Sequence, residues 1–383
     1  MLALQTLAVQ VVWVGVRVLG GLLAVERGAG VAELGLLAAV TAAPALVGAV
    51  LVGRLCDRVG GAAVAAAGVA VLLAGTVVVA TAPDFRQLLV GSAVSGAGGL
   101  LAMLGQQAIV AARSKVEHRT GHYSTVTTAA SVGQLLAPLL VTGGAAGAGM
   151  DAGLLACFGT GCLGLVVAIV AVGVPEDHGT RTDSVRLSIP AHRVLRMPGV
   201  WRSVGTSAAV LVTVDLLYTM LPLWAAERDV PTAVLGALLA LRAGVSVLSR
   251  LGLARVVHRI GVRLVLTGAL ALGVTALVLL AVAPTWAGWI ALTLLGVALG
   301  APQPITMAWT IGLVPSTMHG AALGLRLWAN RTAQVVLPMT AGALIAPAGF
   351  PGFALINAGL LAGACYLVST ANFPRGQLPE WES

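Results

Sequence analysis

The sequence predicts an all-helical integral membrane protein with twelve transmembrane helices arranged as two pseudo-symmetric six-helix bundles. Of its 383 residues, 58% are hydrophobic and 9% are charged, and the mean hydropathy is +0.98. Soluble proteins carry about a quarter charged residues. The apolar runs are unbroken Ala, Val, Leu and Gly, whereas the strands of membrane barrels alternate apolar and polar residues. A helix of about 20 apolar residues crosses a bilayer, so the length of the chain predicts about twelve membrane-spanning helices.

Polar residues, or Pro and Gly, separate the apolar runs, and each run predicts one span. The first six spans cover residues 4–25, 32–53, 61–82, 87–112, 123–147 and 152–174. The second six cover 200–224, 232–254, 262–283, 286–312, 320–345 and 352–372. The first run lacks a basic leader and exceeds a signal-peptide core in length, so it predicts a retained span. We therefore expect an N-terminal bundle over 1–174, a linker over 175–199, and a C-terminal bundle with a short tail over 200–383.

The distribution of Lys and Arg predicts the orientation. With the N-terminus inside, fifteen of them fall on the cytoplasmic side and three, Arg27, Arg86 and Arg228, fall outside. This is a strong positive-inside bias. Both termini and the linker are therefore expected in the cytoplasm, with the protein in the inner (cytoplasmic) membrane. The net charge of +8 follows from this topology, so nucleic acid is not an expected partner.

The two halves of the sequence are copies of each other. Several charged and glycine positions recur at an offset of 201 residues. They are Glu26-Arg27 with Glu227-Arg228, Leu34-Gly35 with Leu235-Gly236, Pro83 with Pro284, and Arg54, Arg58 and Gly60 with Arg255, Arg259 and Gly261. After a slip of one residue, Gln134 and Pro138 match Gln334 and Pro338. An even number of spans per repeat returns the chain to the same side, so the halves are expected in parallel orientation.

Cofactor chemistry finds no support in the sequence. The four cysteines have no Cys-x-x-Cys spacing, and the six histidines fall in polar breaks between spans. No metal, disulfide framework or cofactor is therefore expected. Nothing resembles a phosphate-binding loop, which argues against ATP as the energy source. A membrane-embedded enzyme or a receptor would need a nucleophile, metal ligands or a sensory domain, and we do not predict one.

The loop after the second span reads Gly53-Arg54-Leu55-Cys56-Asp57-Arg58-Val59-Gly60. It resembles the Gly-x-x-x-Asp-Arg-x-Gly signature of the major facilitator superfamily, whose fold has twelve spans in two halves. A degenerate second copy follows the eighth span, with Ala254 and His258 in place of the glycine and aspartate. The resemblance implies a gate formed by ionic contacts that exist in one conformation. The expected gating residues are Gly53, Asp57, Arg58, Gly60, Arg255, Arg259 and Gly261; the alternative for Arg54 and Arg58 is that they only anchor the topology.

The fifth span contains Gly133-Gln134-Leu135-Leu136-Ala137-Pro138. This segment is similar to the proline-glycine motif of drug:proton antiporters in the same superfamily, which suggests efflux of drugs or metabolites. Ala137 stands where that motif has glycine, and a kinked helix with small faces is the alternative. The fourth span reads Ser92 to Gly99 where proton-coupled exporters carry an arginine. A proton pathway built on that arginine is therefore not expected.

Four arginines and one aspartate lie away from the ends of the predicted spans: Arg17, Arg242, Arg326, Arg331 and Asp215. Such a group in hydrocarbon costs from about 3 to more than 10 kcal/mol, so each should face a cavity or a partner. Static ion pairs are the alternative, as is snorkelling for Arg326. Arg17 and Asp215 both lie about 20 Å from the cytoplasmic face. We expect them to pair between the halves when the outer side is closed; a permanent pair, or no contact at all, is the alternative.

Polar residues beside these charges complete the expected substrate and coupling site. Helical spacing groups Gln10, Trp13 and Arg17 on one face, and Asp215 with Tyr218 on another. On the eleventh span it groups Arg326, Asn330 and Gln334, with Arg331 beside them. The full set is Arg17, Asp215, Trp13, Gln10, Tyr218, Gln106, Gln107, Gln134, Arg242, Gln303, Asn330, Arg331 and Gln334. Lone amides among them can also serve to bridge helices.

The favoured interpretation is a monomeric secondary active transporter that moves a small solute by rocking of its two halves. Transport is expected to be outward and driven by protons. The alternative is uptake or exchange of a small organic anion, because arginines outnumber aspartate within the spans. The expected partners are a small-molecule substrate, protons and membrane lipid.

Overall fold

The computed structural model describes residues 1–113, 119–148, 150–173, 191–315, 318–345 and 348–371. Most of the predicted linker, 175–190, lies outside these residues. The chain divides into two compact units. Unit 1 comprises Met1–Val185 and Tyr218–Ala240, and unit 2 comprises Arg186–Leu217 and Leu241–Ser383. The predicted division at the linker stays a prediction, since it follows sequence halves while these units follow contacts.

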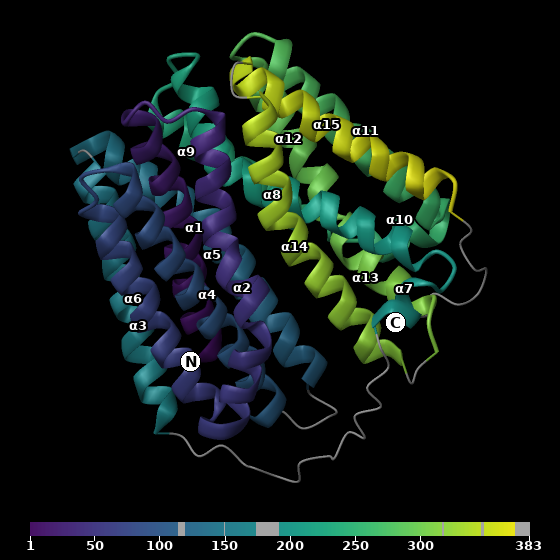
Figure 1. The fold of residues 1–383 in the computed structure, drawn as a ribbon, viewed down its shortest axis with the longest axis horizontal. Coiled ribbons are helices and arrows are strands. Elements are labelled where there is room, and N and C mark those ends of the chain that lie inside the picture. Colours follow the sequence, from purple (N-terminus) through teal and green to yellow (C-terminus); the bar gives the residue numbers. More distant parts are fainter. Residues whose placement is uncertain (114–118, 149, 174–190, 316–317, 346–347, 372–383) are drawn as a thin grey trace. The chain divides into compact units, whose positions relative to one another are not determined.

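The described residues form helices in the order that the sequence predicts (Figure 1). The first half holds α1 (Leu2–Glu26), α2 (Val31–Val59), α3 (Gly61–Ala80), α4 (Phe85–Arg113), α5 (Arg119–Ala148) and α6 (Met150–Val172). A short α7 (Ala191–Leu195) precedes α8 (Val200–Ala226) and α9 (Thr232–Leu248). The remaining helices are α10 (Leu253–Ile260), α11 (Val262–Val282), α12 (Ala287–Gly300), α13 (Pro302–Gly312), α14 (His319–Ile345) and α15 (Gly349–Ser369).

All twelve predicted spans are helical, but two of them consist of two helices each. The predicted span 232–254 consists of α9 and α10, which are bent by 62° at the break between them. The predicted span 286–312 consists of α12 and α13. Ten described helices or helix pairs are long and apolar enough to cross a membrane, and α9 with α10 makes an eleventh. The remaining predicted span, the eleventh, is α14, which carries Arg326, Asn330, Arg331 and Gln334.

The backbone repeats between the halves at the offset found in the sequence. Gly60, between α2 and α3, has φ 91° and ψ 149°, and Gly261, between α10 and α11, has φ 86° and ψ 151°. Gly28 has φ 78°, and its equivalent, Asp229, has φ 53°. A non-glycine residue in this left-handed region is uncommon. The turns after α1 and α8 therefore share one conformation even where only one copy has glycine.

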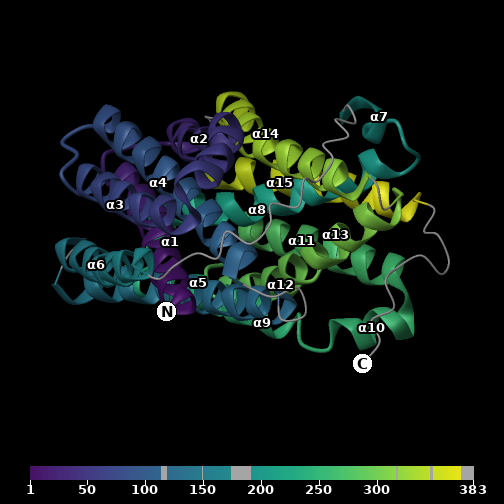
Figure 2. The same cartoon turned by 90° about the horizontal axis from the view of Figure 1, so that it is seen from below.

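In unit 1, α3 and α4 approach at two series of glycines, each spaced by seven residues. Gly61, Gly68 and Gly75 lie on α3, and Gly91, Gly98 and Gly105 lie on α4. A Cβ on Gly98 would lie 2.6 Å from Leu72 Cα, and one on Gly61 would lie 2.8 Å from Gly105 O. Small residues at such a contact let helix backbones pack closely. This packing positions α4, which also contacts α1 and α2 (Figure 2).

Candidate functional site

Arg17 lies on α1 between two aromatic rings of unit 1. Its side chain is 9% exposed, and its guanidinium carbon is 5.7 Å from the ring centroid of Trp13 and 5.7 Å from that of Tyr218. Trp13 is one helical turn before Arg17, which brings the two side chains together, and Tyr218 comes from α8. A guanidinium at this distance from an aromatic face is held by a cation–π interaction, which strengthens when the pair is shielded from water. Trp13 and Arg17, which helical spacing groups on one face, are therefore in contact.

The ring of Trp13 is itself fixed by a glycine on α4. A Cβ on Gly99 would lie 2.6 Å from Cε3 and 2.7 Å from Cζ3 of the indole. Real Cβ atoms do not approach other atoms this closely. The absence of a side chain at residue 99 therefore makes room for the indole beside Arg17.

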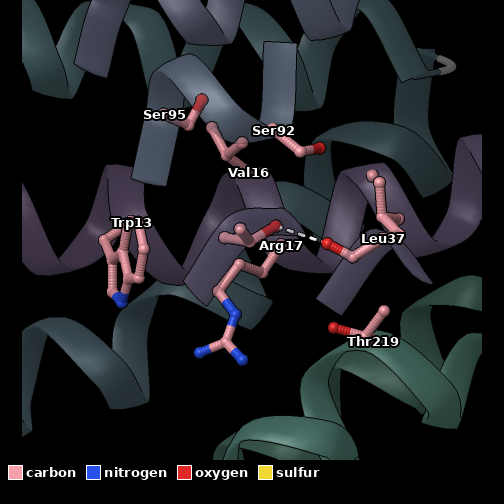
Figure 3. Close-up of a pocket in the computed structure, with 9 residues that line it drawn as sticks. Trp13, Val16, Arg17, Leu37, Ser92, Ser95 and Thr219 are labelled. Atoms are coloured by element: carbon pink, nitrogen blue, oxygen red, sulfur yellow. Dashed lines mark hydrogen bonds between the residues drawn. The ribbon is translucent and has the colours of Figure 1, made fainter. Parts of the chain in front are cut away.

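A small cavity borders Arg17 (Figure 3). Its volume is about 10 Å³, room for about one water molecule. It is lined by Trp13, Val16, Arg17, Gly20, Leu37, Thr41, Ser92, Ser95 and Thr219. The guanidinium extends away from Ser92 and Ser95, which lie on the opposite side of α1 in this view. The serines and threonines of this cavity are not among the predicted site residues; the three-residue spacing of Ser92 and Ser95 on a buried span was the signal that could have found them.

The segment that resembles the proline-glycine motif lies at the contact between α5 and α1. A Cβ on Gly133 would lie 2.6 Å from Leu7 O and 2.8 Å from Gln10 Cβ. Next to it, Gln134 Nε2 donates to Gln10 Oε1 at 3.5 Å. Pro138 lies inside α5. The motif thus brings two predicted site residues, Gln10 and Gln134, into contact.

The two predicted glutamines of α4 have different surroundings. Gln106 is buried, and its Nε2 has no hydrogen-bond partner among the described residues. Gln107 is exposed. Consecutive residues on a helix point about 100° apart, so one of the pair faces the interior of unit 1 while the other faces outward.

In unit 2, Asp215 belongs to a chain of side-chain hydrogen bonds. Gln334 of α14 donates from Nε2 to Asp215 Oδ2 of α8. Arg331 Nη1 donates to Gln334 Oε1 at 3.0 Å. Gln334 is buried, and the other two side chains are half-buried. Three of the predicted coupling residues are therefore connected in the order Arg331, Gln334, Asp215.

The predicted site residues of α14 differ in their burial and contacts. Asn330 is buried like Gln334, and its Oδ1 has no hydrogen-bond partner among the described residues. Arg326 Nη2 donates to Gln303 O at 3.4 Å and to Thr306 Oγ1 at 3.3 Å. Arg326 therefore contacts α13 within unit 2. Gln303 takes part through its backbone carbonyl.

Arg242 of α9 is 2% exposed. Its backbone lies where α9 approaches α12, because a Cβ on Gly296 would lie 2.8 Å from Arg242 O. Nearby in sequence, Arg250 Nε donates to Gly300 O at 3.2 Å. These contacts tie the α9–α10 break to α12.

The predicted gating loops lie at the surface. Asp57, Arg58, Arg255 and Arg259 are exposed, and a Cβ on Gly53 would meet nothing within 4 Å. The gating role of these residues stays a prediction. Gly60 and Gly261 take the left-handed conformation described above and end their helices. The predicted pair of Arg17 and Asp215 joins residues of different units, and it stays a prediction.

A set of buried polar contacts made by α8 was not predicted from the sequence. Thr213 Oγ1 donates to Asn357 Oδ1 of α15 at 2.7 Å, and the hydroxyls of Ser203 and Thr310 are 2.7 Å apart. Ser203, Thr206, Ser207 and Thr213 all lie on α8 and are all buried. Four hydroxyl side chains within eleven residues of one apolar span were the available signal. These contacts hold the helix that carries Asp215 against α13 and α15.

The fold and these buried charges define a polytopic membrane transporter. The sequence matches the family model described as Major Facilitator Superfamily over residues 2–266, and the chain belongs to that family. It is thus a multi-pass membrane protein of a transporter family. Within the described ranges, no group of three or more His, Cys, Asp or Glu side chains could hold a metal ion.

Solved structures with the same fold share little sequence with this chain. The nucleoside transporter NupG has a TM-score of 0.77 at 12% identity, with 96% of this chain and 97% of that chain covered. A D-xylose-proton symporter has a TM-score of 0.77 at 16% identity, with 98% of each chain covered. A bacterial homolog of the human lysosomal transporter Spinster, inward-facing and unoccupied, has a TM-score of 0.74 at 13% identity, with 96% and 95% covered. No curated protein matches the sequence significantly. At these identities the likeness establishes the fold alone.

Proposed function

We propose that this protein is a secondary active transporter that moves a small solute outward across the cytoplasmic membrane by alternating access, driven by protons. It works as a monomer with both termini in the cytoplasm. The observation that carries the proposal is the chain from Asp215 through Gln334 to Arg331. Asp215 is an acidic residue in the middle of the spanning helix α8. An ionisable side chain at this depth is costly, so its presence indicates a function.

Protonation of Asp215 changes both its charge and its hydrogen-bonding character. The carboxylate accepts hydrogen bonds, whereas the protonated acid also donates one. A proton taken up on one side of the membrane and released on the other would drive the cycle if the two protonation states favour different conformations. The resemblance of 133–138 to the motif of drug:proton antiporters supports the outward direction.

A second candidate is uptake or exchange of a small organic anion. The four buried or half-buried arginines, Arg17, Arg242, Arg326 and Arg331, support it. Arg17 in particular is held between two rings, and a guanidinium is well suited to bind a carboxylate or phosphate group.

Transport by purified protein in liposomes tests the proposal. A mixture of labelled drugs, metabolites and organic anions is loaded on one side, and accumulation is followed with and without an imposed pH gradient. We expect gradient-driven accumulation with wild type, loss of the gradient dependence with Asp215→Asn, and retention of exchange at equilibrium. Glu33→Gln is the matched control, because Glu33 is an exposed carboxylate that accepts from Gly30 N, as glutamine also can. Transport by wild type that does not depend on the pH gradient refutes proton drive. Transport of anions alone, down their own concentration gradient, favours the second candidate.

A further inference from the structure

We propose that a groove between α3 and α6 binds one phospholipid, whose acyl chain occupies the groove and whose phosphate lies at Arg27. The two helices are in contact (Figure 1), and the volume of the groove is about 390 Å³, which is within the range of small-ligand sites. Residues from the end of α3 and the start of α6 line it, among them Thr76, Ala80, Thr81 and Leu155. All of them belong to unit 1. The groove is separate from the charged residues on which the proposed function rests.

The groove opens toward lipid. Both α3 and α6 are long and apolar enough to cross a membrane, and only 28% of the residues in the most apolar stretch of α6 are buried. Leu155 is 71% exposed, and Val77 and Phe158, which also line the groove, are exposed as well. Exposed side chains within a spanning segment face the hydrocarbon of the bilayer. Acyl chains are therefore the molecules that surround the mouth of the groove.

The polar atoms inside the groove are already engaged by their own helix. Thr76 Oγ1 donates to Leu72 O at 2.8 Å, and Thr81 Oγ1 donates to Val77 O at 2.9 Å. The other lining residues have hydrocarbon side chains. A polar solute would give up hydrogen bonds to water on entering and find few in return, which is unfavourable. An acyl chain has none to give up, so hydrocarbon is the occupant that fits.

A fixed cation lies where the groove ends. Helix α3 ends at Ala80, and the carbonyl of Ala82, one residue beyond Thr81, accepts from Arg27 Nη2 at 2.5 Å. Arg27 Nη1 donates to Leu23 O at 2.8 Å. A guanidinium has five N–H donors, so these two bonds hold the group in place and leave donors for a ligand. Arg27 is exposed, and a guanidinium matches the geometry of a phosphate. The end of a span is also the depth at which lipid headgroups begin.

Carboxylates beside Arg27 indicate which headgroup fits. Glu26 precedes Arg27, and Asp84 lies two residues after Ala82; both acidic side chains are exposed. Asp84 Oδ1 accepts from Gln87 N at 2.8 Å. These carboxylates repel additional negative charge and attract an ammonium group. The charges therefore favour a zwitterionic headgroup, with its phosphate at Arg27, over a headgroup with a net negative charge.

The internal repeat supplies a matched position in the second half. Leu355 near the start of α15 is equivalent to Leu155 after the slip of one residue, and it is 48% exposed. The arginine equivalent to Arg27 is Arg228, whose guanidinium carbon lies 5.5 Å from the ring centroid of Trp224. The two arginines thus have different surroundings. Leu355 is a lipid-exposed position at the same place along its helix, against which labelling of Leu155 can be compared.

Photolabelling of purified full-length protein in detergent micelles tests the groove. The probe is a phosphatidylcholine with a photoreactive group near the carboxyl end of one acyl chain, added at increasing molar ratio, and labelled peptides are quantified by mass spectrometry. Labelling around Leu155 should saturate at about one lipid per protein. Labelling around Leu355 should be severalfold lower and rise in proportion to the added lipid. Equal, unsaturated labelling at the two positions would refute the site without any variant being needed.

Two alanine variants on α3 test whether the lipid occupies the groove itself. Ala80→Phe fills the groove from within and should lower labelling around Leu155 severalfold. Ala74→Phe is the matched control, because Ala74 is exposed on the same helix and does not line the groove; its labelling should equal that of wild type. If Ala80→Phe is folded and labelled like wild type, the groove is not the binding site.

The role of Arg27 is separated from that of the groove by comparing lipids with and without a phosphate. Native mass spectrometry measures retention of phosphatidylcholine and of a diacylglycerol with the same acyl chains. Arg27→Gln should lower retention of phosphatidylcholine severalfold and leave that of diacylglycerol unchanged, whereas Arg86→Gln, at another exposed arginine, should change neither. An equal loss of both lipids in Arg27→Gln would refute the phosphate contact. Wild type should retain phosphatidylcholine better than phosphatidylglycerol, and the reverse order would overturn the preference for a zwitterionic headgroup.

Discussion

Replacing Gly99 by alanine should disturb the packing of Trp13 against Arg17, because residue 99 is packed against the indole. The added Cβ would lie 2.6 Å from the indole of Trp13, whereas ordinary contacts begin at 3.4 Å. A rigid ring cannot absorb this overlap without turning, and overpacking of this kind costs about 1–3 kcal/mol. Turning the ring also weakens its contact with Arg17, worth up to about 2 kcal/mol when shielded from water. Alanine returns about 0.5–1 kcal/mol through its helix preference, which leaves a net loss of about 2 kcal/mol.

The matched control is Gly159→Ala on α6, where the added Cβ would meet nothing within 4 Å. Thermal unfolding of both variants in detergent, followed by tryptophan fluorescence, gives the comparison. We expect Gly99→Ala to unfold at a lower temperature than wild type and Gly159→Ala to unfold at the same or a higher one. In a Trp13→Leu background, the penalty of Gly99→Ala should largely vanish, because the clashing ring atoms are gone. Equal stability of the two glycine variants would show that the indole does not rest on Gly99.

Three further predictions concern the gate, the topology and the proposed pair. Asp57→Asn should slow transport with little loss of folded protein, because Asp57 is exposed and its proposed gate contact exists in one state; unchanged flux at normal yield would remove the gate role. A cysteine at Ser184 should react with an impermeant maleimide only from the cytoplasm and one at Asp151 only from outside, and reversed labelling would overturn the topology. Arg17→Gln should impair transport more than Arg17→Gln with Asp215→Asn, whereas effects that simply add would dismiss the pair.

The order of the helices, and most of their ends to within about four residues, could be predicted from the sequence, because apolar runs, Pro and Gly report directly on the backbone. The predicted end of α2 at 53 was wrong, since the helix runs to Val59. The break between α9 and α10 was missed, although its cause is local. Gly252 has φ 75° at this break, and its equivalent in the first half is Leu51, which lies within the unbroken α2. The left-handed conformation costs a non-glycine residue about 1–2 kcal/mol. An isolated glycine in an apolar run does not reveal which conformation it takes, so the break could not be read from residue type.

The charged residues of the candidate site could be predicted, because a charged side chain is rare within an apolar span. Arg17, Asp215 and Arg331 stood out for that reason, and helical spacing placed Trp13 beside Arg17. The role of Gly99 depends on contact between α1 and α4, which no spacing within one helix reveals. Ser92 and Ser95 were missed because hydroxyls are common in spans, where they often bond to their own helix as Thr41 does to Leu37 O at 2.7 Å.

The two halves of the repeat differ in the side chain that accepts a hydrogen bond from the equivalent glutamine. Gln134 and Gln334 occupy equivalent positions, and each donates to a side chain on the first long helix of its own half. In the first half the acceptor is the neutral amide of Gln10 at 3.5 Å, so the contact does not respond to protons. In the second half the acceptor is the carboxylate of Asp215, and Arg331 occupies the other end of the glutamine. Equivalent glutamines thus hold two helices together through neutral side chains in one half and through charged ones in the other, and this asymmetry is what the proposed proton drive requires.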